Sequence, residues 1–174
     1  YHLSTMAKQY IAGIFKHIQE ITLVLSQWVN SYKRLVPGYE APVYISWGTR
    51  NRSALVRIPE YKPGKEKATR IEVRSPDPAC NPYLAFALML ASGLKGVEEK
   101  LELLPPVEKD IFHLSEEERE RLHIGCLPGS LEEAVCLFEK SKLAKETLGD
   151  HIFESLIANK KMEWDAYRIH VSKY

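Results

Sequence analysis

The spacing of apolar side chains near the start of the chain predicts an amphipathic helix over residues 4–29. Apolar positions recur there every three or four residues, which places them on one face of a helix. They are Met6, Tyr10, Ile14, Ile18, Ile21 and Leu25. Asn30-Ser31 is expected to end this helix, and Pro37-Gly38 marks a loop after it.

Three short strands are predicted next. Residues 43–47 and 54–58 are rich in apolar side chains and are joined by the polar turn 49–52. A loop over 60–67, which contains a proline, a glycine and three lysines, leads into a third strand over 70–74. These strands are expected to pair in antiparallel fashion.

Helices are predicted for the rest of the chain. Asn81-Pro82 supplies an N-cap and a first-turn proline, and the following residues 83–95 are apolar nearly all round. A helix of that kind is expected in the middle of a core. Its glycines, Gly93 and Gly96, are expected to mark close packing or fraying. Beyond a proline-containing linker, further helices are expected after the capping-box pairs Ser115/Glu118 and Ser130/Glu133 and over residues 150–170.

The third strand carries the most informative chemistry. Because side chains alternate between the two faces of a strand, Arg70, Glu72 and Arg74 share one face. Guanidinium groups bind phosphate or carboxylate oxygens through paired hydrogen bonds, and a carboxylate between them can hold a cation. The alternative is an exposed strand with a simple ion pair.

Composition narrows the possible partners. The 174 residues are 45% hydrophobic and 27% charged, with a net charge of +1, which is ordinary for a globular protein. Bulk charge therefore indicates neither nucleic acid nor a membrane as a partner. Six arginines between residues 34 and 74 indicate a local anion site instead. The three cysteines lack metal-ligand spacing and are expected to be buried free thiols of a cytoplasmic protein.

Two further segments carry candidate residues. Pro37-Gly38 precedes Glu40, an arrangement that suits a mobile flap with an acid near its tip; an exposed loop is the alternative. Arg52 and Arg57 have opposite parity along a strand, so they share a face only if one lies in the turn or at a bulge. Each could also be a surface arginine. The lysines of the 60–67 loop could screen phosphates or simply be solvated.

Taken together, these segments resemble glutamine synthetase of the bacterial and archaeal type I class. The resemblance covers essentially the whole chain and is densest between residues 30 and 90. The matching segments are 30–42 (NSYKRLVPGYEAP), 51–54 (NRSA), 57–59 (RIP), 70–78 (RIEVRSPDP) and 81–83 (NPY).

The resemblance implies an ATP-dependent ligase that makes glutamine from glutamate and ammonia through a γ-glutamyl phosphate, with Mg²⁺ or Mn²⁺ as the metal. It implies an α+β fold whose antiparallel strands help to form an open, barrel-like funnel, with helices in the C-terminal half. It assigns catalysis to Glu40 and Arg52, and glutamate binding to Arg34, Glu40 and Arg74. The remaining assignments are ATP or phosphate binding by Arg52, Arg57, Lys67 and Arg70, and metal binding by Glu72.

The resemblance also predicts that parts of the family's active site lie outside these 174 residues. The family's N-terminal β-grasp-like domain and most of its metal ligands would lie before Tyr1, so residues 1–174 are expected to be the C-terminal portion of the catalytic domain and inactive alone. The complete protein is expected to form a cytoplasmic dodecamer of two hexameric rings. A γ-glutamyl-polyamine or other amine ligase, or a non-catalytic homologue with a regulatory or assembly role, stays open as an alternative.

Overall fold

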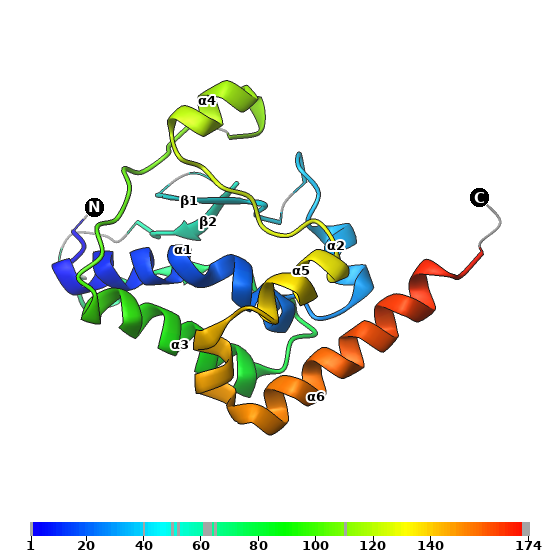
Figure 1. The fold of residues 1–174 in the computed structure, drawn as a ribbon. Helices are drawn as coiled ribbons and strands as arrows, with labels where there is room; N and C mark the ends of the chain where they lie inside the picture. Colours follow the sequence, from blue (N-terminus) through cyan, green and yellow to red (C-terminus); the bar gives the residue numbers. More distant parts are fainter. Residues whose placement is uncertain are drawn as a thin grey trace.

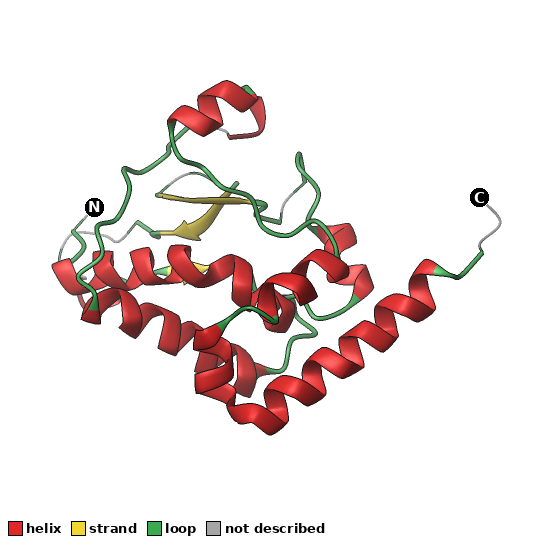
Figure 2. Cartoon of the chain, in the orientation of Figure 1, coloured by secondary structure: helices red, strands yellow, loops and turns green. Residues whose placement is uncertain are grey.

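A computed structural model describes residues 2–39, 41–49, 51, 53–60, 64, 66–109 and 111–171. A small sheet lies on one side of a layer of helices, and the long helix α6 runs obliquely away from the body toward the C-terminus (Figure 1). Figure 2 shows that helix predominates. The described regular elements after residue 98 are all helical. The expected α+β class with a helical C-terminal half is therefore confirmed.

The first predicted helix is in fact two. Helix α1 spans Thr5–Leu25, and the short helix α2 spans Val29–Arg34. The prediction that Asn30-Ser31 ends the first helix was wrong, because both residues lie inside α2. The chain leaves α1 after Leu25, whose carbonyl oxygen accepts a hydrogen bond from the Asp77 amide at 2.7 Å instead of from a further helical turn.

The three strands form one sheet in the order β1-β2-β3, with β1 over Tyr44–Gly48, β2 over Ala54–Arg57 and β3 over Glu72–Val73. Strands β2 and β3 are antiparallel, as expected. Strands β1 and β2 are parallel, so the antiparallel prediction was wrong for this pair. The parallel pairing excludes a hairpin of these two strands, and the Asn51 side chain, between them in sequence, donates to the carbonyl oxygens of Val107 and Lys109 far along the chain.

The outer edge of β1 is covered by segments from much later in the chain. The Ile45 amide donates to the Gly125 carbonyl oxygen, the Leu127 amide donates to Val43, and the Val107 amide donates to Trp47. At the other edge, β3 is shorter than the predicted strand over 70–74, because its ladder with β2 pairs only two residues. The sheet is thus hydrogen-bonded to later segments at its β1 edge, and its β3 edge is formed by a strand of two residues.

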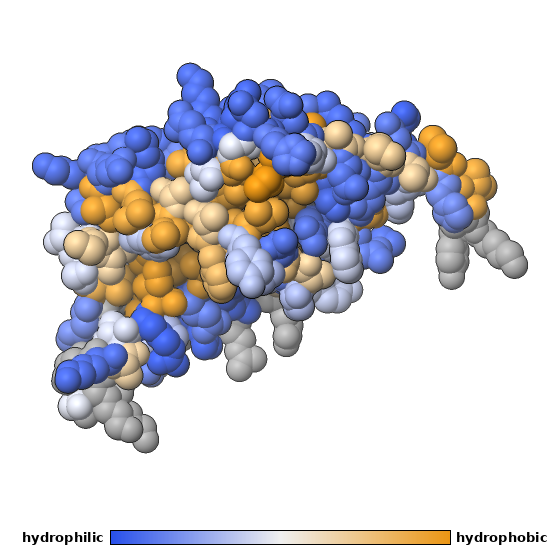
Figure 3. All heavy atoms as spheres, turned by 90° about the horizontal axis from the view of Figure 1, so that it is seen from below, coloured by the Kyte–Doolittle hydropathy of each residue, from blue (hydrophilic) through white to orange (hydrophobic). Residues whose placement is uncertain are grey.

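Helix α3, Pro82–Glu98, begins where the sequence predicts, with the Asn81 side chain accepting from the amides of Tyr83 and Leu84. One face packs closely on α1. The opposite face is exposed, so the prediction of a helix buried all round was wrong. Its exposed apolar side chains are Tyr83 (83%), Phe86 (67%), Leu90 (54%) and Leu94 (48%). Figure 3 shows hydrophobic side chains gathered on this underside of the molecule.

After α3, the described residues form the short 3-10 helix Ile111–His113 and three α-helices. The α-helices are α4 (Glu116–Arg121), α5 (Leu131–Phe138) and α6 (Lys142–Arg168). The Ser115/Glu118 capping box is confirmed. At α5 the Ser130 half is present, but the Glu133 carboxylate binds the Gly129 amide instead. Helix α6 starts earlier than predicted because Ser141 caps it, and it is kinked at Gly149.

The main core joins α1 and α3 with the sheet and the C-terminal helices. Its largest fully buried side chains include Ile11, Ile14, Ile18, Leu55, Leu88 and Phe138. Cys80 is half-buried, while Cys126 and Cys136 are exposed, so the expectation of buried thiols was wrong; all three are free. Among the described residues, no helix is both long and apolar enough to span a bilayer.

Candidate active-site surface

The centre of the candidate site is an ion pair across β2 and β3. Arg57 and Glu72 are direct partners in the antiparallel register. The Arg57 guanidinium donates from both Nη2 (2.8 Å) and Nε (3.2 Å) to the same oxygen, Oε2 of Glu72. Both side chains are a little over one-third exposed. The pair therefore sits at the surface, where an incoming anion could compete for the guanidinium.

Arg74 adds a second guanidinium to this pair. Its Nε lies 3.7 Å from Oε1 of Glu72, and its Nη1 donates to the Ala54 carbonyl oxygen at 3.2 Å. At 18% exposure it is the more buried of the two arginines. The predicted sharing of one face by Glu72 and Arg74 is thus present, and each carboxylate oxygen of Glu72 faces one arginine.

Arg34, at the end of α2, approaches the chain just beyond β3. Its Nη2 donates to the Ser75 carbonyl oxygen at 2.7 Å, and its Nε lies 3.9 Å from Oδ2 of Asp77. That Nε is buried and has no hydrogen-bond partner among the described residues. Burial raises the pKa of the neighbouring Cys80 thiol, and the Asp77 carboxylate raises it further. The thiol is therefore kept protonated beside the two charges.

Sequence reasoning assigned no role to Ser75 or Asp77. The signal that could have found them is their position in the SPDP turn directly after Arg74. Asp77 also folds this turn, since its carboxylate accepts from the Ala79 amide at 2.7 Å. The turn brings Arg34 and Arg74, which are far apart in sequence, to the same end of β3.

The remaining predicted residues are less connected. Arg70 is exposed, and its Nη1 donates to the nearby Ala68 carbonyl oxygen at 3.2 Å; the structure gives it no contact with Glu72. Lys67 is exposed on the short 3-10 helix Glu66–Ala68. Glu40 and Arg52 lie outside the described residues. The described part of the chain thus brings together Arg57, Glu72 and Arg74, with Arg34 nearby.

The donor set does not make a metal site by itself. Among the described residues, no group of three or more histidine, cysteine, aspartate or glutamate side chains is placed to hold an ion. Glu72 can offer one carboxylate, whereas Mg²⁺ takes six ligands in octahedral geometry. In the present arrangement both Glu72 oxygens also face arginines. The described residues therefore do not fit a divalent metal without further ligands.

Three of the cavities lined by described residues lie away from these side chains. One of about 500 Å³ lies between α4 and residues 106–109, and one of about 400 Å³ lies between α1 and residues 101–104. A third, of about 290 Å³, lies beside Trp47 and Pro105. None of the three is lined by Arg34, Arg57, Glu72 or Arg74.

This fold and this surface define a class: an α+β protein with arginines arranged around a carboxylate on strands β2 and β3 of a small sheet, suited to anionic ligands. A family model described as the glutamine synthetase catalytic domain matches residues 1–174. The chain therefore belongs to the glutamine synthetase family.

Curated relatives and solved structures agree with this assignment. Glutamine synthetase of Mycolicibacterium smegmatis is 53% identical over 172 residues, which are 99% of this chain and 39% of that protein. The enzyme of Methanosarcina mazei is 55% identical over 166 residues, 95% of this chain and 36% of that protein. A structure described as apo GmaS without ligand matches with a TM-score of 0.81, 32% identity and coverage of 98% and 37% of the two chains. A GmaS/ADP complex matches with a TM-score of 0.82, 31% identity and coverage of 98% and 38%. The chain thus spans less than two-fifths of the length of these relatives.

Proposed function

We propose that this chain is the C-terminal portion of the catalytic domain of a glutamate–ammonia ligase, a cytoplasmic enzyme that makes glutamine at the expense of ATP. The observation that carries the proposal is the 53% identity to a glutamine synthetase across 99% of the chain. At this level of identity the arginine-bearing segments would serve the same chemistry. A solved neighbour described as an ADP complex is compatible with a nucleotide site in this fold.

The proposed reaction has two steps. The γ-carboxylate of glutamate attacks the terminal phosphorus of ATP, which forms γ-glutamyl phosphate and releases ADP. Ammonia then attacks the acyl carbon, and phosphate leaves as the new C–N bond forms. In both steps negative charge is redistributed over phosphate oxygens, which fixed guanidinium groups stabilise.

The described arginines have suitable positions for such roles. Arg57 would hold phosphate oxygens of ATP, and Arg74 would hold glutamate or the transferring phosphoryl group. Arg34 would bind the glutamate carboxylate through donors that it does not use for Ser75. Glu72 orients both neighbouring guanidiniums and would offer one ligand to a divalent metal completed by other parts of the enzyme. The four side chains come from α2, β2, β3 and the residue after β3.

The other assignments extend the same proposal. Lys67 and Arg70 would contact ATP, Arg52 would stabilise the phosphoryl group in transfer, and Glu40 would close the site and take a proton from ammonium. Mg²⁺ or Mn²⁺ would assist phosphoryl transfer. Because Glu72 cannot complete a metal site alone, the 174-residue chain by itself would be inactive. The complete enzyme would be a dodecamer of two hexameric rings.

The test is γ-glutamyl hydroxamate formation from glutamate, hydroxylamine, ATP and Mg²⁺, measured for the complete polypeptide that carries this chain and for the 174-residue chain. Activity of the first and silence of the second is expected. Turnover by the 174-residue chain would refute the argument about the metal site. Silence of the complete polypeptide would refute the glutamate–ammonia ligase proposal and favour the γ-glutamyl-amine ligase or the non-catalytic homologue.

The acceptor is tested in the same preparation by replacing hydroxylamine with ammonium or with putrescine. Ammonium is expected to give the faster release of ADP and phosphate. Equal or faster turnover with the diamine would instead favour the γ-glutamyl-amine ligase.

A further inference from the structure

The position of Arg34 depends on a very short helix. Helix α2 has six residues, Val29–Arg34, with Arg34 at its C-terminal end. An isolated helix of this length is not stable in water, so tertiary contacts must hold it in place. The elements that pack against α2 therefore set the direction in which Arg34 reaches the substrate surface, by which we mean the side chains of Arg34, Arg57, Glu72 and Arg74. One of its neighbours is α6.

The first contact from α6 is made by Glu163. Its Oε1 accepts a hydrogen bond of 3.1 Å from the amide of Val29, the first residue of α2. This amide has no acceptor within its own helix, because the first amides of a helix precede the carbonyl groups that would pair with them. The Glu163 side chain is 32% exposed. Glu163 thus anchors the start of α2.

Lys160 holds this carboxylate in place. Its Nζ lies 2.7 Å from Oε2 of Glu163, one helical turn along α6, and its side chain is only 7% exposed. A lysine that is buried to this extent is almost always paired. The two oxygens of Glu163 therefore have separate partners: one is fixed by Lys160 and the other binds α2.

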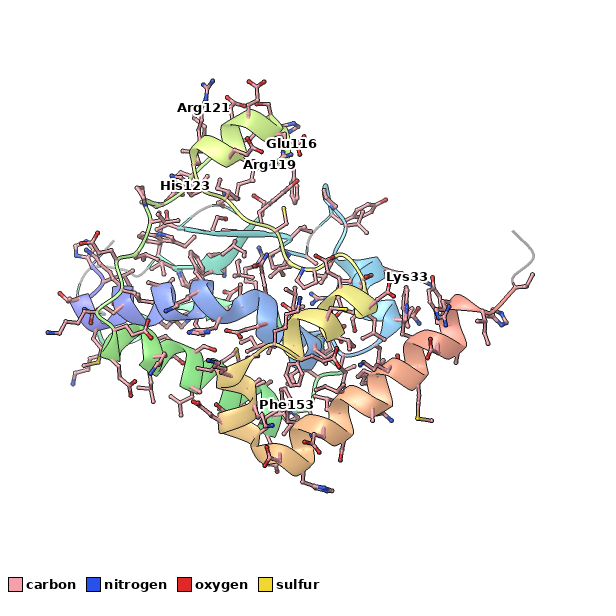
Figure 4. The ribbon with its side chains drawn as sticks, viewed as in Figure 1. Lys33, Glu116, Arg119, Arg121, His123 and Phe153 are labelled. Atoms are coloured by element: carbon pink, nitrogen blue, oxygen red, sulfur yellow. The ribbon has the colours of Figure 1, made fainter. Side chains whose placement is uncertain are left out.

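A second contact lies one turn further along both helices. The Lys33 ammonium is 5.9 Å from the centre of the Tyr167 ring, within the range of a cation–π interaction. Figure 4 shows Lys33 on α2 beside the C-terminal part of α6. Val29 and Lys33 are four residues apart, as are Glu163 and Tyr167. Because residues with this spacing lie on one face of a helix, two successive turns of α6 meet two successive turns of α2.

The far end of α2 meets the substrate surface. Arg34 directly follows Lys33, and its guanidinium reaches the Ser75 carbonyl oxygen at the end of β3. Its buried Nε has no hydrogen-bond partner among the described residues. A displacement of α2 along α6 would therefore move this guanidinium relative to Arg74 and the rest of the cluster.

We infer that Glu163, fixed by Lys160, is a positioning residue for Arg34 and thereby sets the affinity for the substrate carboxylate. This inference rests on the proposed function, in which Arg34 binds glutamate. It predicts an effect on the glutamate KM that is separate from any effect on the ATP KM, because Arg57, to which ATP binding is assigned, is held by its pairing with Glu72 in the sheet.

The experiment measures the KM values for glutamate and for ATP in the complete polypeptide with Glu163→Ala, Glu163→Gln or Lys160→Met. Glu163→Ala should raise the glutamate KM on the order of tenfold, since small misplacements of binding groups have effects of this size or larger. The ATP KM should change less than about twofold. Glu163→Gln keeps an acceptor for the Val29 amide but loses the charge, so its effect should be smaller.

Lys161→Met is the matched control. Lys161 is the neighbour of Lys160 on α6 and also forms an ion pair, 2.5 Å to Glu139, but it is exposed and its partner lies at the end of α5. Both KM values should stay close to wild type in this variant. In an Arg34→Lys background, Glu163→Ala should raise the glutamate KM no further, because the residue that it positions has already been changed.

The outcomes are distinguishable. A glutamate KM that rises alone in the Glu163 and Lys160 variants supports the inference. An unchanged glutamate KM, or a parallel rise of both KM values with a lower melting temperature, overturns it and leaves the ligase proposal standing. A wild-type polypeptide without γ-glutamyl transfer activity overturns both.

Discussion

The crossing of α1 and α3 gives a quantitative prediction for Gly13→Ala. A Cβ atom added at Gly13 would lie 2.3 Å from the Ser92 carbonyl oxygen and 2.7 Å from the Gly96 amide nitrogen, whereas ordinary contact begins at 3.4 Å. The backbones would have to separate by about 1 Å, since neither atom belongs to a flexible side chain. Overpacking of this kind typically costs about 1–3 kcal/mol.

The opposing effect is the better helix propensity of alanine. In the interior of a helix, alanine is favoured over glycine by about 1 kcal/mol. At this crossing the steric cost should be at or above the upper end of its range, because two backbones clash and the core around Ile14 must also shift. We therefore expect a net loss of about 2 kcal/mol, which corresponds to a fall in melting temperature of about 4–8 °C for a chain of this size.

The assay is thermal and urea unfolding of the 174-residue chain, followed by circular dichroism. Gly129→Ala is the control, because the added Cβ would meet only a carboxylate oxygen of Glu133 at 3.8 Å. Its stability should stay within about 0.5 kcal/mol of wild type. A Gly13→Ala chain as stable as wild type, or more stable, would show that the helices separate without cost and that the close-contact argument is wrong.

Two other predictions concern the surface and the acid stability of the 174-residue chain. Phe86→Glu should reduce the self-association of the chain in sedimentation experiments, because Phe86 lies on the exposed apolar face of α3. Val171→Glu introduces the same charge outside this face and should not reduce self-association. Equal effects of the two substitutions would refute a role for the face. Burial, the largest single effect on the Glu20 carboxyl, raises its pKa, but hydrogen bonds from His17 and Ser141 and the charges of His17 and Lys16 together lower the pKa below its ordinary value of 4.5. The unfolded chain then binds the proton more tightly, so the contribution of Glu20 to stability is complete above pH 4.5 and is lost as the pH falls further. Glu20→Gln should therefore flatten the fall of the urea midpoint below about pH 5. An unchanged slope would count against this role of Glu20.

The parts of the fold that could be predicted from the sequence are those that depend on local signals. The Ser115/Glu118 capping box and the Asn81-Pro82 helix start depend on residues within one turn, and both are present as expected. The contact glycines of α3 also matched their expected role. These features need no knowledge of distant parts of the chain.

Long-range pairing could not be predicted in the same way. Strands β1 and β2 are parallel, and segments near Val107 and Gly125, far along the chain, hydrogen-bond to the other edge of β1. The exposure of one face of α3 likewise depends on which elements are available to cover it. An apolar pattern shows that a face needs a cover, but it does not identify the element that supplies it.

The candidate site shows the same division. Alternation along one strand correctly put Glu72 and Arg74 on a shared face. It could not show that Arg57 pairs with Glu72, because this pairing depends on the register between β2 and β3. The anchoring of α2 by Glu163 was also missed, since the two partners are 134 residues apart in sequence.

The register of β2 and β3 leads to a last prediction, for Glu72→Gln. The ion pair between Arg57 and Glu72 is more than one-third exposed on both sides, so water and salt screen it. Exposed or cross-strand charge pairs of this kind contribute about 0–1 kcal/mol to stability. The substitution should therefore lower the melting temperature by no more than about 4 °C. Glutamine is also similar to glutamate in shape, so β3 should keep its pairing with β2.

Activity should respond very differently to the same substitution. Without the carboxylate, two guanidiniums lose the charge that orients them, and loss of one such preorganised electrostatic interaction typically lowers turnover on the order of 100-fold. The complete polypeptide with Glu72→Gln should thus be folded but nearly silent in the γ-glutamyl hydroxamate assay, whereas Lys161→Met should be both folded and active. Near-normal turnover of this variant would refute a role for Glu72 in the active site. A large fall in melting temperature would instead show that the pair is structural, because a surface pair needed mainly for substrate should be nearly dispensable for folding.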